Sequence, residues 1–146
     1  MLKPDTLENY ENAYDIEWAV EMPEGCPPQD ILIPKNEKMY RLTINPDKVT
    51  DDDFKSYIEM YPEKKYNGTQ KIMAAGLSLI STDKPQNLTF PMMKKFKGVA
   101  ELILNPEDGV LQQTGKNIEH YTWWRTKAFD INKAKIIGDE KDTEHK

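Results

Sequence analysis

The stretch EHYTWWRTK, residues 119–127, brings together two of the chain's three tryptophans, a tyrosine, an arginine and one of its two histidines. A polar turn at residues 115–117 precedes it, and its aromatic and β-branched content predicts a strand. Successive side chains of a strand point to opposite faces. The two predicted faces are Ile118, His120, Thr122 and Trp124 on one side and Glu119, Tyr121, Trp123 and Arg125 on the other.

We expect the Ile118/Trp124 face to be the core, because it is the more apolar of the two. Tyr121 and Trp123 then form a half-exposed aromatic pair between Glu119 and Arg125. Such a pair can stack a nucleobase or a sugar while the charges orient it. It can equally lie under a helix as ordinary packing. We favour the packing role and keep Tyr121, Trp123 and Arg125 as the candidate ligand-binding residues of this strand.

The rest of the chain predicts an α+β fold with an antiparallel sheet of four to six strands. Strand patterns occur in four further segments: 39–44, 71–82, 99–104 and 110–113. Helix signals occur near 6–15 and, as a capped helix with Thr50 as its N-cap, near 50–61. Four prolines in residues 21–34 predict an extended strap. We expect one globular domain over 1–137 and a mobile charged tail over 138–146.

Charge is distributed unevenly along this chain of net charge −5. Residues 1–63 carry 15 acidic and 6 basic side chains, whereas residues 64–137 carry 6 acidic and 12 basic ones. The basic part either attracts phosphate or is neutralised by the acidic part folding back on it, and we favour neutralisation. Lys94, Lys95 and Lys97 form the lysine group that we keep as a further candidate ligand-binding site.

Composition limits the classes of function. Cys26 is the only cysteine, so an internal disulfide and a Cys/His zinc cluster are excluded, and we expect no metal site. Glycine-rich phosphate-binding motifs are absent from the sequence. No run approaches the ~18 apolar residues of a membrane span, and the first 17 residues contain no apolar stretch typical of a signal peptide. We therefore expect a cytoplasmic protein without a membrane partner.

One enzymatic arrangement remains, in the order Arg41 in "YRL", Ser78 in "GLSLIST" and Glu119 on the late strand. This order resembles the Arg, Ser-Thr-Ser and Glu series of ADP-ribosyltransferases, although "SLIST" replaces Ser-Thr-Ser. The resemblance implies that Arg41 holds a phosphate or ribose of NAD, that the serine strand shapes the nicotinamide pocket and that Glu119 orients the ribose hydroxyl. NAD is the cofactor of this alternative alone.

We expect a small cytosolic binding or accessory protein that acts without catalysis and without a cofactor. Aromatic and basic side chains are plentiful, whereas the sequence contains no convincing set of acid, base and nucleophile. The expected ligand is a protein or a nucleotide-like molecule, and nucleic acid is less favoured because the sequence pI is about 5.1. An ADP-ribosyltransferase-like enzyme is the alternative.

Overall fold

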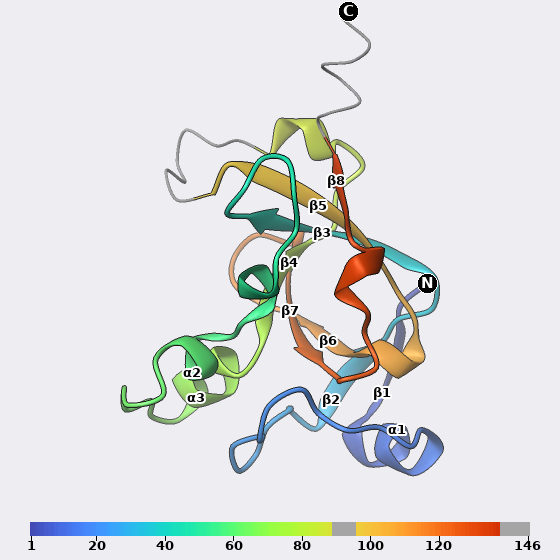
Figure 1. Cartoon of the computed structure of the whole chain (residues 1–146). Helices are drawn as coiled ribbons and strands as arrows, with labels where there is room; N and C mark the ends of the chain where they lie inside the picture. Colours follow the sequence, from blue (N-terminus) through green and yellow to red (C-terminus); the bar gives the residue numbers. More distant parts are fainter. Residues whose placement is uncertain (89–95, 138–146) are drawn as a thin grey trace, which may run out of the picture.

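Strand β7 (His120–Arg125) lies inside the sheet and pairs antiparallel with β6 (Gly109–Gln113) and β4 (Leu77–Ile80). The structure is a computed structural model that describes residues 1–88 and 96–137 (Figure 1). These residues form one sheet of eight strands in the order β1-β2-β6-β7-β4-β3-β5-β8, and every pairing is antiparallel. The other strands are β1 (Lys3–Thr6), β2 (Asp30–Ile33), β3 (Glu37–Thr43), β5 (Gly98–Leu104) and β8 (Lys135–Ile137).

The sheet is strongly curled. In Figure 1, β3 and β5 lie above β6 and β7, and β4 joins the two levels. Five of these strands contribute side chains to one buried cluster inside the curl. Its members from the strands include Met39, Leu79, Leu102, Leu111 and Trp123.

The outer face of β7 is also covered. Helix α1 (Leu7–Ala13) supplies Tyr10, which packs in a second buried cluster with Trp124. The irregular connector from 14 to 29 follows α1 and adds Trp18 and Met22 to this cluster. It is fixed to the end of β7, where Ala19 N–H donates to the carbonyl of Arg125 at 3.0 Å. The predicted N-terminal helix is therefore present, whereas the strap predicted over 21–34 is irregular only as far as residue 29 and then forms strand β2.

Both indole rings of β7 are fully buried, so the prediction of a half-exposed Trp123 is wrong. Trp123 Nε1 donates to the carbonyl of Asp108 and Trp124 Nε1 to that of Ile72, each at 3.0 Å. Ile118, which was predicted to lie in the core, is 80% exposed in the turn before the strand. Alternation of side chains predicts which residues are exposed only when one face of the strand is in contact with water. Both faces of β7 are covered, so neither face is exposed.

The predicted helix over 50–61 is two separate pieces. A 3₁₀ turn spans Asp51–Phe54, and α2 spans only Tyr57–Met60. Asp53 caps the beginning of the first piece, because its carboxylate accepts from the backbone N–H of Thr50 at 2.8 Å, and it also accepts from Ile44 N–H at 2.8 Å. Ser56 then begins a new helix: its hydroxyl accepts from Glu59 N–H, and the Glu59 carboxylate accepts from Ser56 N–H.

Two further strand predictions need correction. The segment 71–82 is not one strand, because α3 (Thr69–Ala74) occupies its first part and β4 follows. Gly76 joins them where a Cβ atom would collide with the side chain of Thr122, so the close approach of α3 to β7 requires glycine. The predicted strands at 99–104, 110–113 and 118–125 are consecutive in the chain but do not form an antiparallel meander, since β6 pairs with β7 but β5 pairs with β3 and β8.

The sheet has eight strands rather than four to six because three short segments outside the predicted strands, β1, β2 and β8, also pair into it. Strand β1 has the sequence KPDT, with no aliphatic or aromatic residue, yet all four of its residues pair with β2. The three-residue strand β8 extends the opposite margin by pairing with β5. Among the described residues, no helix is long and apolar enough to cross a membrane.

Replacing Trp123 by Ala is expected to lower the free energy of unfolding by about 3–5 kcal/mol, because it leaves a large cavity and removes the indole hydrogen bond to the Asp108 carbonyl, which then accepts only from Thr126 N–H. Urea denaturation followed by circular dichroism measures the change. The matched control is Ile118→Ala, which removes an exposed side chain and should change stability by less than about 0.5 kcal/mol. Equal stability of the two variants would contradict the buried position of Trp123.

Candidate functional site

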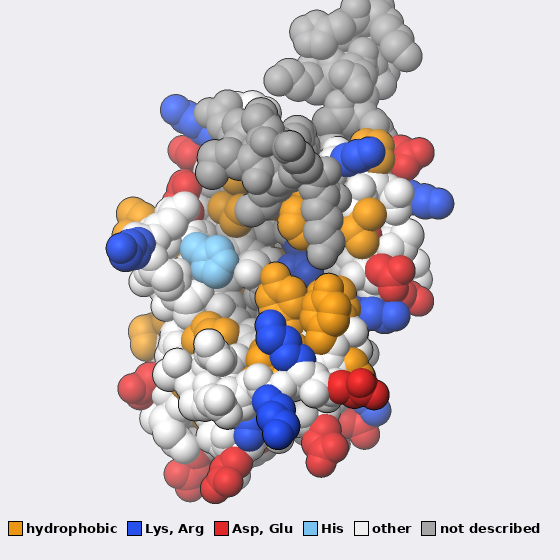
Figure 2. Space-filling model, turned by 90° about the vertical axis from the view of Figure 1, so that its left-hand side faces the viewer, with side chains coloured by type: hydrophobic (Ala, Val, Ile, Leu, Met, Phe, Trp, Pro, Cys, Tyr) orange, Lys and Arg blue, Asp and Glu red, His pale blue; other side chains and the backbone are white. Residues whose placement is uncertain are grey.

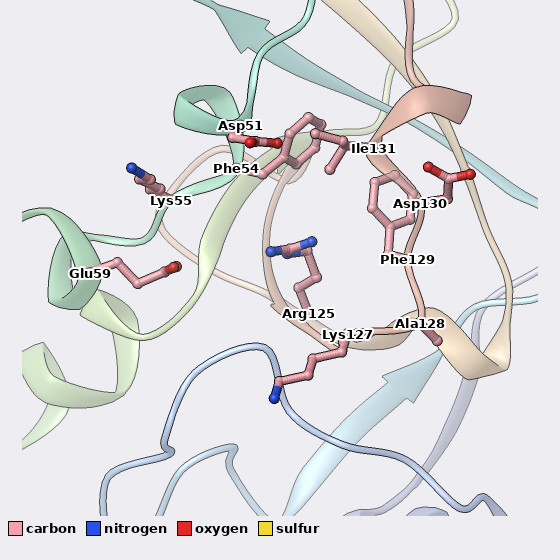
Figure 3. Close-up of a pocket in the computed structure, with 10 residues that line it drawn as sticks. All are labelled: Asp51, Phe54, Lys55, Glu59, Arg125, Lys127, Ala128, Phe129, Asp130 and Ile131. Atoms are coloured by element: carbon pink, nitrogen blue, oxygen red, sulfur yellow. The ribbon is translucent and has the colours of Figure 1, made fainter.

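A pocket of about 530 Å³ opens at the end of β7. Figure 3 shows the side chain of Arg125 projecting into it, with Glu59 on one side and Phe129 on the other. The walls come from the 3₁₀ turn at 51–54, from α2 and from the segment after β7. The lining residues are Asp51, Phe54, Lys55, Glu59, Arg125, Lys127, Ala128, Phe129, Asp130 and Ile131.

The hydrophobic part of the pocket is continuous with the core inside the curl. Phe54 and Phe129 are 1% and 5% exposed, and their ring centroids are 5.6 Å apart. Trp123 packs edge-on against Phe129 with 4.9 Å between centroids. Trp123 therefore supports a residue of the pocket from the core side and does not line the pocket itself.

Arg125 is the cation of this pocket that lacks a close partner. Lys127 pairs with Glu17 at 2.8 Å and Lys55 with Asp52 at 3.0 Å. Within residues 1–88 and 96–137, the guanidinium of Arg125 makes no hydrogen bond and no ion pair. Burial lowers the pKa of Arg125, and the more distant carboxylates of Glu59 and Asp51 oppose this effect.

The backbone around Arg125 is held from two sides. Its carbonyl accepts from Ala19 N–H, and the next residue, Thr126, donates its hydroxyl to the carbonyl of Glu107 at 2.6 Å. Trp123, two residues earlier on the same face of the strand, is locked by the indole hydrogen bond. These contacts fix the strand end, so the guanidinium is presented from a rigid support.

Arg41 lies close to this pocket but is committed to structural contacts. Its Nε donates to the carbonyl of Asp53 and its Nη1 to the carbonyl of Ser78, the latter at 2.8 Å. The guanidinium also lies 5.9 Å from the centroid of the Phe54 ring. Burial lowers the pKa of Arg41 to about 10. Strands β3 and β4 pair at one position only, Tyr40 with Ile80, and Arg41 spans the gap beyond it.

The three residues of the ADP-ribosyltransferase resemblance do not share a cleft. Arg41 bonds to the carbonyl of Ser78, whereas the exposed Ser78 side chain alternates with the core residues Leu77 and Leu79 and thus points to the other face of the sheet. Glu119 is exposed in the turn before β7, and its carbonyl accepts from Ser81 N–H. Ser81 is three residues beyond Ser78, which is roughly 10 Å along a strand.

The predicted binding residues are dispersed. Tyr121 is partly buried against the cluster inside the curl, and Arg125 alone of the predicted set lines the pocket. Lys97 is exposed just before β5, where its N–H donates to the carbonyl of Thr43 at 2.9 Å. Lys94 and Lys95 lie outside the described residues. The structure thus does not unite the lysine group with the β7 residues.

Sequence reasoning missed the exposed tyrosines of α2. Tyr57 and Tyr61 are 57% and 48% exposed, and their rings stack with centroids 6.2 Å apart. A single helix over 50–61, as predicted, would place Tyr57 and Tyr61 on the same side as Phe54, which is buried. The pattern Ser56-x-x-Glu59 is a capping box and was the available signal that a new helix begins there. Figure 2 shows hydrophobic side chains gathered on the side of the molecule where α2 and α3 lie.

The remaining titratable candidates have structural roles. His120 Nδ1 lies 3.0 Å from Thr114 Oγ1 and 3.2 Å from the Thr114 carbonyl. Burial raises the pKa of the Cys26 thiol to about 11, which makes it a poor nucleophile at neutral pH. In the part of the chain that the structure describes, no group of three or more His, Cys, Asp or Glu side chains is arranged to hold a metal ion.

Comparisons with protein-family models, with curated proteins and with solved structures found no match to this chain.

Replacing Arg41 by Ala is expected to reduce the free energy of unfolding by about 2–4 kcal/mol, because the carbonyls of Asp53 and Ser78 both lose a charged hydrogen-bond donor. Chemical denaturation measures the loss, and Lys38→Ala, at an exposed position of the same strand, is the control. If Arg41 served only to bind a ligand, its replacement would leave the free energy of unfolding unchanged. An unchanged value would therefore contradict the structural role.

The Cys26 thiol is expected to react slowly with iodoacetamide in the folded protein. Because its pKa is raised from 9.0 to about 11, the thiolate fraction at pH 8 is about 100-fold below that of an ordinary thiol. The alkylation rate should rise about tenfold per pH unit up to about pH 11, and in 8 M urea it should regain ordinary values. A rate that levels off near pH 9 in the folded state would contradict the assignment.

Proposed function

We propose that this protein is a cytosolic, noncatalytic binding module that holds an anionic group of its ligand on Arg125. The observation that carries the proposal is the state of this side chain. The guanidinium is partly buried in a pocket beside Phe54 and Phe129, and it has no hydrogen bond or ion pair to any residue in 1–88 or 96–137. A cation withdrawn from water without a close partner is costly, and an incoming carboxylate or phosphate repays that cost.

The shape of the arginine and its support favour binding. A guanidinium presents its donors in a planar fork that matches two oxygen atoms of a carboxylate or phosphate. The aromatic residues beside it offer apolar contact to the part of the ligand that carries the anion. The nucleotide-like or protein ligand that we expect from the sequence contains both features.

Noncatalytic binding is preferred to the NAD-using alternative because of the contacts described above. The donors of Arg41 bind the carbonyls of Asp53 and Ser78, and Glu119 lies in a turn away from Arg41. Beside Arg125, the pocket offers the carboxylates of Asp51 and Glu59. Burial lowers the pKa of Arg125 and these carboxylates only oppose that effect, but an arginine stays charged at neutral pH, and the charged form is the one that binds an anion.

Titration of the ¹⁵N-labelled protein with sodium acetate, inorganic phosphate and adenosine monophosphate tests the proposal. At constant ionic strength, at least one of these probes should saturably shift the Arg125 Nε–H signal and the backbone amides of Phe129 and Ile131. Arg125→Ala should weaken the amide response roughly tenfold, the loss expected for a charge-assisted hydrogen bond. Lys127→Ala is the matched control, since this cation already pairs with Glu17. Equal responses in the wild type and Arg125→Ala would contradict the proposal.

A further inference from the structure

The exposed side of α2 carries an apolar surface next to the Arg125 pocket. We call Tyr57, Met60 and Tyr61 the tyrosine patch; they are 57%, 38% and 48% exposed. Glu59, on the same single turn of helix, lines the Arg125 pocket. Tyr57, Met60 and Tyr61 have the i, i+3, i+4 spacing of one helix face, whereas Glu59 points to the pocket from another side of the turn, so the patch and the pocket flank α2.

The tyrosine patch has a defined local structure. The carbonyl of Tyr57 accepts from Tyr61 N–H at 2.8 Å and from the hydroxyl of Tyr66 at 3.1 Å. The rings of Tyr57 and Tyr61 stack at an angle of 23° between their planes. A shallow hollow of about 450 Å³ follows, lined by residues 60–64. Because hydrogen bonds already hold the backbone of this turn, a partner that binds there immobilises few additional groups, and the entropic cost of binding is small.

The residue types of this surface are those of protein interfaces. Tyrosine, methionine and arginine are enriched at the buried centres of protein–protein contacts, and tyrosine and arginine dominate binding hot spots. The two tyrosine rings are tilted by 23° with 6.2 Å between their centroids and adjoin Met60, so they form an uneven apolar surface rather than a pair of parallel plates. This arrangement favours side chains of a polypeptide as the occupant.

The charges around the patch specify the partner further. Residues 64–71 contain three lysines and no acidic residue, and Arg125 stands on the other side of α2. Glu59 and Glu63 are interspersed among these cations. A nucleic-acid strand or an anionic bilayer presents closely spaced phosphates and would meet these carboxylates unfavourably. A peptide presents separate carboxylates together with N–H groups, which suit the mixed charges.

We propose that α2 and the Arg125 pocket form a docking site for an acidic peptide segment of another protein. An aspartate or glutamate carboxylate of the segment binds the Arg125 guanidinium, and an apolar side chain a few residues away packs on the tyrosine patch. The lysines of 64–71 attract further acidic residues of the segment. This docking site rests on the anion-binding role proposed for Arg125 and adds the class of partner.

Selection of a phage-displayed library of random 12-residue peptides on the full chain tests the docking site. The enriched peptides should combine Asp or Glu with Leu, Phe or Trp within five residues. The most enriched peptide, labelled with fluorescein, is then measured by fluorescence anisotropy. Arg125→Ala and the double variant Tyr57→Ala/Tyr61→Ala should each weaken its binding at least tenfold, whereas Ile118→Ala, an exposed apolar control, should leave it unchanged.

Several results would overturn the docking site: no enriched peptide, enriched peptides without acidic residues, or equal binding by the wild type and the double tyrosine variant. Tighter binding of phosphatidylserine vesicles or of oligothymidylate, lost in the same variants, would assign the surface to a different partner. Urea denaturation establishes that each variant is folded. If Arg125→Ala loses the acetate or phosphate response while the peptide results fail, only the docking site is wrong; if that response survives Arg125→Ala, the proposed function itself is wrong.

Discussion

The structure depends on the burial of two adjacent indole rings that point in opposite directions from β7. Each ring needs an apolar environment and an acceptor for its N–H, so both faces of the strand must be covered. The curl of the sheet covers Trp123, and α1, the connector and α3 cover Trp124. Layers from the beginning, middle and end of the chain thus converge on one six-residue strand.

The Arg125 pocket is a product of the same arrangement. Trp123 holds Phe129 edge-on, and Phe129 lies beside Phe54, so the core inside the curl extends to the base of the pocket. Arg125 lies two residues after Trp123 on the same face of β7. It is the last residue of the strand, where the face is no longer covered and the pocket opens. One face of one strand therefore carries both a fully buried aromatic residue and the candidate binding cation.

Local patterns in the sequence predicted local structure well. Alternation located β3, β6 and β7, and helix and proline signals located α1 and the connector. The face of β7 that would be exposed was not predictable, because that depends on segments distant in sequence covering both sides. Strand β1 was missed because KPDT joins the sheet through backbone hydrogen bonds without an apolar pattern. Arg125 was predicted as a candidate, but its neighbours Phe54, Glu59 and Phe129 converge only through the tertiary fold.

The single pairing position between β3 and β4 divides the sheet into two leaves, with β1, β2, β6, β7 and β4 in one and β3, β5 and β8 in the other. Arg41 crosses this seam with one side-chain hydrogen bond, from its Nη1 to the carbonyl of Ser78 on β4, in place of ladder hydrogen bonds. A long flexible side chain tolerates small changes of spacing better than a backbone ladder does. The seam is thus the place where we expect small relative motions of the two leaves. Each leaf keeps its own strand pairing during such motions, and the Arg41 side chain keeps the two leaves connected.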